Sequence, residues 1–273
     1  MKKTIIALLL FFVLGNINAQ DLVILHTNDT HSQILPQTAG PGAGLAGYQR
    51  REAFINKTRA EHKNVLLMDA GDFSQGTPYF TLFKGDAEIE LMNALGYDVA
   101  CLGNHEFDNG VKEISRRISN AKFPFVCSNY DFSNCSLNSK VKPYTIIKRG
   151  KYKVGVIGVH TDISTLVNPK NIEGMVYKQP YKIIDSLASI LKFNEKCNLV
   201  IVLSHVGYDD GSDHAPSDDM LAKNTENVDV IIGGHSHTYI ESKTIVTNKI
   251  GKDVVIVTAE EKGNYVGKLE FWF

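Results

Sequence analysis

The segment Leu22-Val23-Ile24-Leu25-His26-Thr27-Asn28-Asp29-Thr30-His31 joins a strand-like apolar run to a polar cluster. An apolar run followed by polar residues recurs four more times, with the clusters Gly71-Asp72, Gly103-Asn104-His105-Glu106, Ser204-His205 and Gly234-His235-Ser236-His237. Helical patterns separate several of these runs. Asp, Asn and His at successive strand ends are the residues that a protein needs to hold metal ions at the rim of a sheet.

The alternation of strand and helix patterns predicts an α/β fold. We expect helices over Gly47–Glu61, Asp86–Leu95 and Tyr181–Phe193, and another that Asp108 or Asn109 caps. Two segments are typical of antiparallel strands, namely a hairpin over Tyr144–Val159 and three strands over Thr244–Phe273. Parallel strand–helix units combined with antiparallel hairpins predict mixed sheets covered by helices.

The composition is that of a globular chain of 273 residues, with 43% apolar and 22% charged residues. This length fits one domain with a sizeable core. The formal net charge is −1 without basic runs, which argues against duplex nucleic acid or an anionic membrane as partner. The four cysteines match no CxxC metal pattern, and we expect Cys101 and Cys127 to be buried free thiols.

Residues 1–19 have the pattern of a signal peptide. Met1-Lys2-Lys3 forms the basic region, Ile5–Leu14 forms the apolar region, and small residues follow up to Ala19. This apolar run is short for a bilayer, and no later stretch is long enough, so no stable membrane insertion is expected. We therefore expect an exported protein, periplasmic or secreted, whose folded domain comprises residues 20–273.

Two of the polar clusters contain pairs of metal-ligand residue types at alternate positions. Residues i and i+2 of an extended strand point to the same side. Asp29 can therefore bind one cation together with His31, and His235 can do so with His237 if these segments remain extended.

The other clusters contain complementary ligand atoms. Gly71 lets the backbone approach a ligand closely, and the two oxygens of Asp72 can bridge two metals. Asn104 offers an amide oxygen and His205 an imidazole nitrogen.

Taken together, these clusters resemble those of the calcineurin-like metallophosphoesterases. More narrowly, the secreted 5′-nucleotidase/UDP-sugar hydrolase family has motifs that look like Leu25-His26-Thr27-Asn28-Asp29, Gly71-Asp72-x-x-Gln75-Gly76-Thr77-Pro78 and Asn104-His105-Glu106-Phe107-Asp108. The resemblance covers essentially all of the chain after the leader. It implies a four-layer α/β/β/α sandwich of two mixed sheets and hydrolysis of a nucleotide or another small phosphoester, with 5′-nucleotides favoured.

The resemblance also implies the ligands of two divalent metal ions. One ion would be bound by Asp29, His31, Asp72 and His237, and the other by Asp72, Asn104, His205 and His235. A nitrogen and oxygen ligand set without thiolate suits Zn²⁺, Mn²⁺, Fe or Co²⁺. Two such cations can activate water and polarise phosphoryl oxygens.

The resemblance assigns His105 a catalytic role without metal binding, in contact with the phosphoryl group. Asp108 lies three residues further on, where it can accept a hydrogen bond from His105 and keep the ring cationic. The remaining histidines, at positions 26, 62, 160 and 214, are expected to be structural or at the surface.

One departure from the family concerns substrate recognition. Full-length members carry a second, C-terminal domain that binds the nucleotide, whereas the resemblance here covers the metal-binding domain alone, so we expect the second domain to be absent. Three alternatives follow: a catalytic subunit that needs a separate C-terminal-type recognition chain; a free-standing phosphatase, cyclic phosphodiesterase or UDP-sugar hydrolase of broader specificity; or a metal-stabilised binding protein without turnover. The ligand set and the pair His105 and Asp108 argue against the last.

Overall fold

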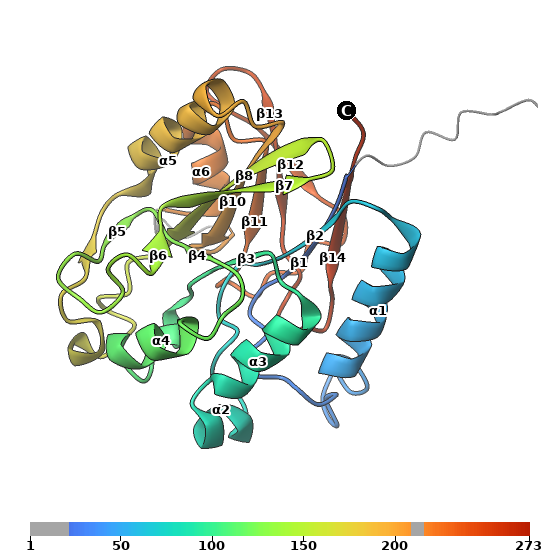
Figure 1. Cartoon of the computed structure of the whole chain (residues 1–273), viewed down its shortest axis with the longest axis vertical. Coiled ribbons are helices and arrows are strands. Elements are labelled where there is room, and N and C mark those ends of the chain that lie inside the picture. The colour runs from blue at the N-terminus through green and yellow to red at the C-terminus, as the bar shows by residue number, and fades with distance from the viewer. Residues whose placement is uncertain (1–21, 209–215) are drawn as a thin grey trace, which may run out of the picture.

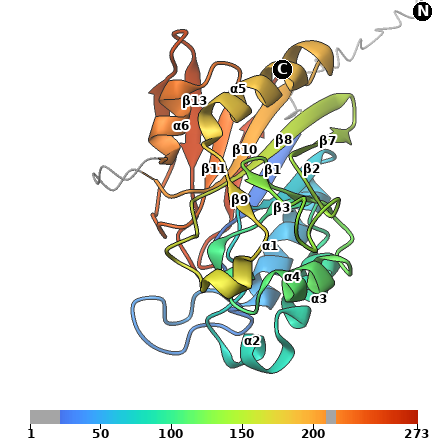
Figure 2. The same cartoon turned by 90° about the vertical axis from the view of Figure 1, so that its left-hand side faces the viewer.

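The computed structural model describes residues 22–208 and 216–273 as two β-sheets packed face to face between layers of helices (Figures 1 and 2). The predicted leader, residues 1–19, lies outside the described residues. Within them, no helix has the length and apolar character needed to cross a membrane. The predicted fold class, a sandwich of two mixed sheets, is confirmed.

The first sheet has the strand order β14-β1-β2-β3-β4-β6. Its neighbouring strands are parallel except for β14, which is antiparallel to β1. The strands are β1 (Leu22–Thr27), β2 (Val65–Asp69), β3 (Val99–Cys101), β4 (Phe125–Val126), β6 (Val141–Lys142) and β14 (Gly267–Phe271).

The second sheet has the strand order β12-β13-β11-β10-β8-β7, with antiparallel strands at both edges. The strands are β7 (Tyr144–Arg149), β8 (Tyr152–His160), β10 (Leu199–His205), β11 (Val230–Gly233), β12 (Thr244–Thr247) and β13 (Asp253–Val257). A small separate sheet pairs β5 (Tyr130–Asp131) with β9 (Val176–Tyr177).

Helices cover the outer face of each sheet (Figure 1). The first sheet is covered by α1 (Tyr48–Glu61), α3 (Asp86–Leu95) and α4 (Val111–Ile118), and the short α2 (Pro78–Phe83) contacts α3. The second is covered by α5 (Pro180–Ser189), its π-helical continuation η3 (Ile190–Asn194) and α6 (Asp218–Asn224). Two short 3₁₀ helices, η1 (Asn104–Phe107) and η2 (Pro169–Ile172), lie in loops.

Most of the predicted elements are confirmed, and two differ. The N-cap of α4 is Gly110, so the prediction that Asp108 or Asn109 caps this helix is wrong. Asp108 instead ends η1, because its side chain turns toward His105. The third C-terminal strand, β14, leaves the sheet of β12 and β13 and joins β1 in the other sheet.

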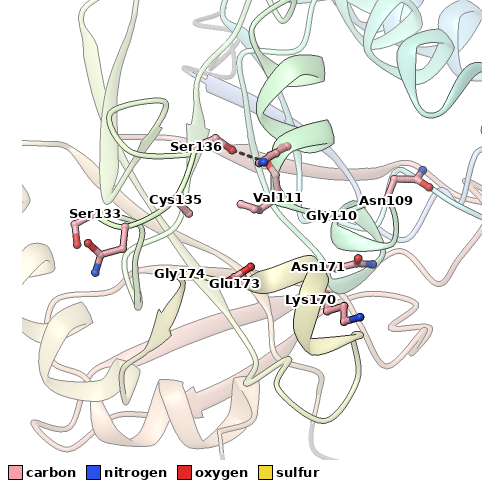
Figure 3. A pocket seen from close by; sticks show the side chains of 12 residues that line it. Asn109, Gly110, Val111, Ser133, Cys135, Ser136, Lys170, Asn171, Glu173 and Gly174 are labelled. Atoms are coloured by element: carbon pink, nitrogen blue, oxygen red, sulfur yellow. Dashed lines mark hydrogen bonds between the residues drawn. The ribbon is translucent and has the colours of Figure 1, made fainter.

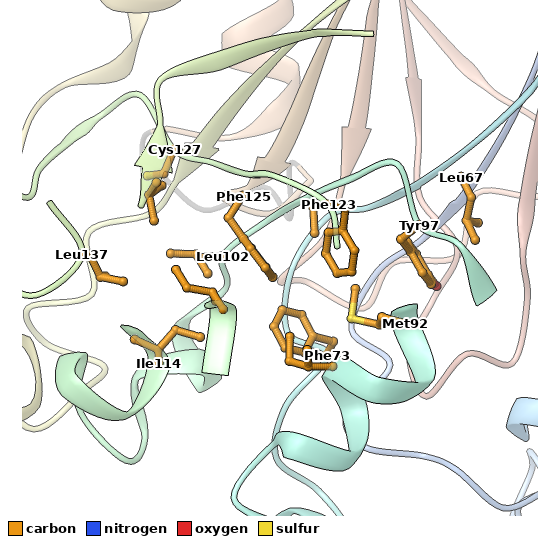
Figure 4. Close-up of a cluster of buried hydrophobic side chains, with 14 of the residues drawn as sticks. Leu67, Phe73, Met92, Tyr97, Leu102, Ile114, Phe123, Phe125, Cys127 and Leu137 are labelled. Carbon is orange, nitrogen blue, oxygen red and sulfur yellow. The ribbon is translucent and has the colours of Figure 1, made fainter. Parts of the chain in front are cut away.

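The core has three layers because strand side chains alternate between the two faces of each sheet. In β1, Leu22 and Ile24 point into the space between the sheets, whereas Val23 and Leu25 face the helices. The helix-side layer of the first sheet is rich in aromatic rings, and Figure 4 shows Phe73, Phe123, Phe125 and Tyr97 packed together above α3 and α4.

The predicted state of the cysteines is confirmed for the two strand positions. All four cysteines are free, and Cys101 and Cys127 are buried. Since no disulfide joins the two sheets, the buried apolar side chains between them hold them together. The polar clusters lie outside this layer, at the strand ends.

The two sheets lie in close contact where β8 passes β4. A Cβ at Gly158 would lie 2.1 Å from the carbonyl oxygen of Val126, a backbone atom that cannot move without shifting β4. Gly155 of the same strand faces the other way, and its Cβ would meet the side chain of Leu191 at 2.8 Å.

We expect Gly158→Ala to lower the free energy of unfolding by about 1–3 kcal/mol or more, because the added methyl group forces the sheets apart. Urea unfolding measures this loss. Gly155→Ala is the matched control, and its smaller loss reflects a flexible neighbouring side chain. Equal losses of unfolding free energy in both variants would show that the contact between the sheets does not cause the destabilisation.

Candidate metal centre

The strand-end clusters of both sheets meet at one rim of the sandwich. Side-chain ligand atoms lie within 4.8 Å of one another in three overlapping groups: Asp29, His31 and His237; His31, Asp72 and His105; and Asp72, His205 and His235. Asp72 belongs to two of these groups. Six of the seven predicted metal ligands are therefore close together, although they come from three loops and from the end of β10.

In the first group, three side chains converge from two sheets. Nε2 of His237 lies 3.5 Å from Oδ1 of Asp29 and 3.0 Å from Nε2 of His31. Asp29 is fully buried, and its carboxylate accepts hydrogen bonds from the backbone N–H of His235 and from Nδ2 of Asn28. Burial lowers the pKa of His31, which favours the neutral imidazole that a cation requires.

In the third group, Asp72 and His205 form a buried pair. Nε2 of His205 lies 3.1 Å from Oδ2 of Asp72, and Nδ1 donates to the carbonyl oxygen of Ala70 at 2.7 Å. Burial disfavours charge on both side chains, but their mutual attraction outweighs it. The attraction between the two side chains lowers the pKa of Asp72 and raises the pKa of His205 to about 10. Burial lowers the pKa of the neighbouring His235 to about 4, so its ring is neutral.

The backbone at these clusters is left-handed. The φ angles are 49° at Asp29, 46° at His31, 54° at Asp72, 75° at His235 and 53° at His237. The expectation that these segments stay extended is therefore wrong. Asp29 and His31 nevertheless fall in one ligand group, whereas His235 and His237 fall in different groups. The chain turns sharply after each strand, and such φ values at residues other than glycine cost about 1–3 kcal/mol each and concentrate at functional sites.

The donor set fits divalent cations. Oδ1 of Asn104 is buried without a hydrogen-bond partner among the described residues. Buried polar atoms normally have a hydrogen-bond partner. A bound cation would supply the partner that is missing here. Imidazole nitrogens, carboxylates and an amide oxygen without a nearby thiolate suit transition-metal ions.

His105 and Asp108 form the predicted pair beside this centre. Nδ1 of His105 lies 2.9 Å from Oδ2 of Asp108, and both side chains are about one-third exposed. The hydrogen bond to Asp108 is the main cause that raises the pKa of His105 to about 8. The ring is therefore largely cationic at neutral pH, and its backbone N–H donates to Oδ1 of Asp72 at 2.9 Å.

The side chain of Glu106 ties two of the strand-end loops together. Its fully buried carboxylate accepts backbone N–H hydrogen bonds from Asp72, Gly103 and Ser74, at 2.9, 2.6 and 3.0 Å. Arg117, also fully buried, donates to the Ser74 hydroxyl and to the Glu106 carbonyl. These contacts fix the loop that carries Asp72 against the loop that carries Asn104 and His105.

Other supporting residues have no signal in the spacing of the clusters. Asn28 is part of the first motif, but its role appears only in space: Nδ2 donates both to Asp29 and to the carbonyl of Glu260. Glu261 contacts His237 from a loop that carries no ligand. The Ala70 contact with His205 involves a main-chain atom, which side-chain patterns do not reveal.

The histidines expected to be structural lie outside the three groups. His26 is buried in β1, and burial lowers its pKa to about 4. His160 is buried behind His205, with ring centroids 5.4 Å apart, and burial lowers its pKa to about 3. His214 lies outside the described residues.

A cavity of about 1030 Å³ is lined in part by the residues that follow Asp108, but neither His105, Asp108 nor a candidate metal ligand lines it. Its wall includes Asn109 and Asn171, and Nδ2 of Asn171 donates to the carbonyl of Asp108 at 2.8 Å. Figure 3 shows Asn109, Asn171 and Lys170 on one side of this space and Ser133 on the other. The lining is mostly polar, so this cavity, which no residue of the three ligand groups lines, is suited to a hydrophilic molecule.

Comparison with known proteins agrees with this geometry. Residues 22–239 match the calcineurin-like phosphoesterase family. The chain belongs to this family. Its members use divalent metals, which agrees with the three ligand groups at the rim of the sandwich.

Among curated relatives, the chain is 34% identical to the snake venom 5′-nucleotidase of Naja atra, over 93% of this chain and 50% of that protein. It is 31% identical to the trifunctional nucleotide phosphoesterase YfkN of Bacillus subtilis, over 93% of this chain and 18% of that protein. The crystal structure of a 5′-nucleotidase precursor from Thermus thermophilus superposes with a TM-score of 0.82 at 34% identity, covering 92% of this chain and 51% of that one. The chain thus spans about half the length, or less, of these relatives.

Glu106→Gln tests the contact that joins the two loops. The amide keeps one acceptor oxygen but places an NH₂ group against a backbone N–H donor, so one buried donor loses its acceptor. We expect the free energy of unfolding to fall by about 1–3 kcal/mol in urea titrations. Glu113→Gln is the control, because Glu113 pairs with Arg116 at the surface and contributes little. Wild-type stability of Glu106→Gln would contradict this role.

Proposed function

We propose that this chain is a phosphoester hydrolase that uses two divalent metal ions and prefers 5′-nucleotides. The observation that carries the proposal is the meeting of three overlapping ligand groups, two of which share Asp72, with the His105 and Asp108 pair beside them. The relatives named as 5′-nucleotidases support the choice of substrate.

The ligand groups suggest how two ions would be held. One ion would be bound by Asp29, His31, Asp72 and His237, and the other by Asp72, Asn104, His205 and His235. Asp72 would serve both ions, because its carboxylate lies near His31 on one side and near His205 on the other. When bound, the two ions would polarise the phosphoryl oxygens and make water a stronger nucleophile.

His105 supplies positive charge and a proton where the phosphoryl group would lie. Its Nδ1 is held by Asp108, so Nε2 remains to face the substrate. A cationic ring offsets negative charge that develops on phosphoryl oxygens, and its proton can pass to the departing alkoxide. Asp108 keeps the ring oriented and charged.

A broader nucleotide phosphoesterase is the second candidate. The observation that favours it is the 31% identity to the Bacillus subtilis protein named as a trifunctional nucleotide phosphoesterase. Cyclic nucleotides and UDP-sugars are therefore included in the substrate test.

Export is part of the proposal. The basic and apolar pattern of residues 2–14 supports it, and one relative is a venom protein. N-terminal sequencing of the protein recovered outside the cytoplasm should give Gln20 as the first residue. A protein that retains residues 1–19 would contradict cleavage after Ala19.

The proposed activity is tested by phosphate release from purified residues 20–273 after chelation and re-addition of Mn²⁺, Zn²⁺ or Co²⁺. The panel contains AMP, UMP, 3′-AMP, 2′,3′-cyclic AMP with an added nucleotidase, UDP-glucose and p-nitrophenyl phosphate. We expect metal-dependent turnover that is greatest for the 5′-nucleotides. Turnover of p-nitrophenyl phosphate alone would place nucleotide recognition in a further domain or a separate chain. No turnover with both ions bound would favour a binding protein.

His105→Ala should reduce the rate by about 10²–10⁴, the usual contribution of a general acid–base group. The variant should still bind as much metal as the wild type, which metal analysis after dialysis measures. Loss of metal in this variant would show that His105 is a ligand and contradict its role. His62→Ala is the control, because no metal-ligand group among the described residues includes His62.

A further inference from the structure

The outer side of His237 is held by a carboxylate. Nδ1 of His237 lies 2.9 Å from Oε2 of Glu261, while Nε2 faces Asp29 and His31. A carboxylate accepts hydrogen bonds and cannot donate them, so Nδ1 carries the proton in this contact. In the neutral imidazole, the lone pair is then on Nε2, the atom that faces the other two candidate ligands.

Glu261 is itself fixed by its loop. The ammonium of Lys262 lies 2.7 Å from Oε1 of Glu261, and the backbone N–H of Lys262 donates to the carbonyl of Asp29 at 2.6 Å. On the other side, the carbonyl of Glu260 accepts from Asn28 at 2.6 Å. The φ angles of Glu260 and Lys262 are 61° and 57°, so the chain turns at both neighbours of Glu261. The loop therefore presents this carboxylate to His237 in a defined position.

The two proposed ion positions differ in the group that holds Nδ1 of their histidine ligand. His205, in the third group, donates from Nδ1 to the neutral carbonyl of Ala70 and is fully buried. His237, in the first group, is held by a charged side chain, and its own side chain is 39% exposed. The orientation of an exposed histidine ligand depends more on a fixed hydrogen-bond partner, because packing alone does not hold its ring.

We propose that Glu261 is a positioning residue for the cation held by Asp29, His31 and His237. It fixes the tautomer and orientation of His237, and its charge makes Nε2 a stronger ligand. The inference rests on the proposed metal site. An outer partner of this kind typically contributes about 10–100-fold to metal affinity. The group of Asp72, His205 and His235 has its own support and gains nothing from Glu261.

Three variants separate charge, hydrogen bond and loop shape. Glu261→Leu removes the acceptor, and Glu261→Gln keeps an acceptor oxygen without the charge. Glu260→Gln is the matched control, because Glu260 lies in the same loop and its carboxylate accepts from Asn264, away from the ligands.

Zn²⁺ is titrated into each chelated full chain in competition with a chromogenic chelator. In the wild type we expect two bound ions. Glu261→Leu should weaken one of them by about 10–100-fold and leave the other unchanged, Glu261→Gln should have a smaller effect, and Glu260→Gln should match the wild type. Wild-type affinity for both ions in a folded Glu261→Leu protein would overturn the inference. So would an equal loss in Glu260→Gln, because loop shape would then explain it.

A second measurement does not depend on bound metal or on activity. Long-range ¹H–¹⁵N NMR of histidine-labelled, metal-free protein, at a pH where the His237 ring is neutral, reports which nitrogen carries the proton. We expect Nδ1–H in the wild type and loss of this preference in Glu261→Leu. A wild-type ring protonated on Nε2 would overturn the inference. A wild type that binds no Zn²⁺ would instead contradict the proposed metal site.

Discussion

The arrangement of the candidate centre depends on one buried carboxylate. Glu106 accepts three backbone N–H groups from the loops that follow β2 and β3, and Arg117 supports it from α4. These N–H groups lie in segments where the chain turns sharply, so no carbonyl of a neighbouring strand or helix accepts from them. A side chain must therefore provide the hydrogen-bond acceptor. The loop conformations are thereby fixed before any ligand is present. Asp72, which belongs to two of the ligand groups, is placed by this contact and by the N–H of His105.

The second constraint is the strain that the ligand loops carry. Left-handed φ values at residues such as Asp29 and His237 persist only where surrounding contacts over-determine them. Here those contacts cross between the sheets: the N–H of His235 binds the carboxylate of Asp29, and Asn28 joins Asp29 to the loop that carries Glu261. The close packing of the two sheets, visible at Gly158, is therefore a condition for the geometry of the site.

Short-range patterns of apolar and ligand-type residues were sufficient to predict mixed sheets covered by helices, most of the helices and the residues that gather at the rim, and the family resemblance supplied the sandwich of two sheets. The sequence was not sufficient for the local geometry. Asp29 and His31 converge through left-handed turns, which the i and i+2 spacing does not encode. Glu261 lies in a loop without a motif, and its contact with His237 exists only after β13 and β14 are placed. The apolar alternation in β14 fits either sheet, so pairing with β1 was not predicted.

The pairing of β14 with β1 has a consequence for the order in which the fold can form. These strands come from opposite ends of the described chain, and Leu22 is opposite Phe271 in their register. A ribosome makes β1 first, but one edge of this strand stays open until β14 has been made. Loop closure over such a separation is slow, and an open edge is prone to wrong pairing. The chain therefore completes its first sheet only after synthesis of almost all the described residues.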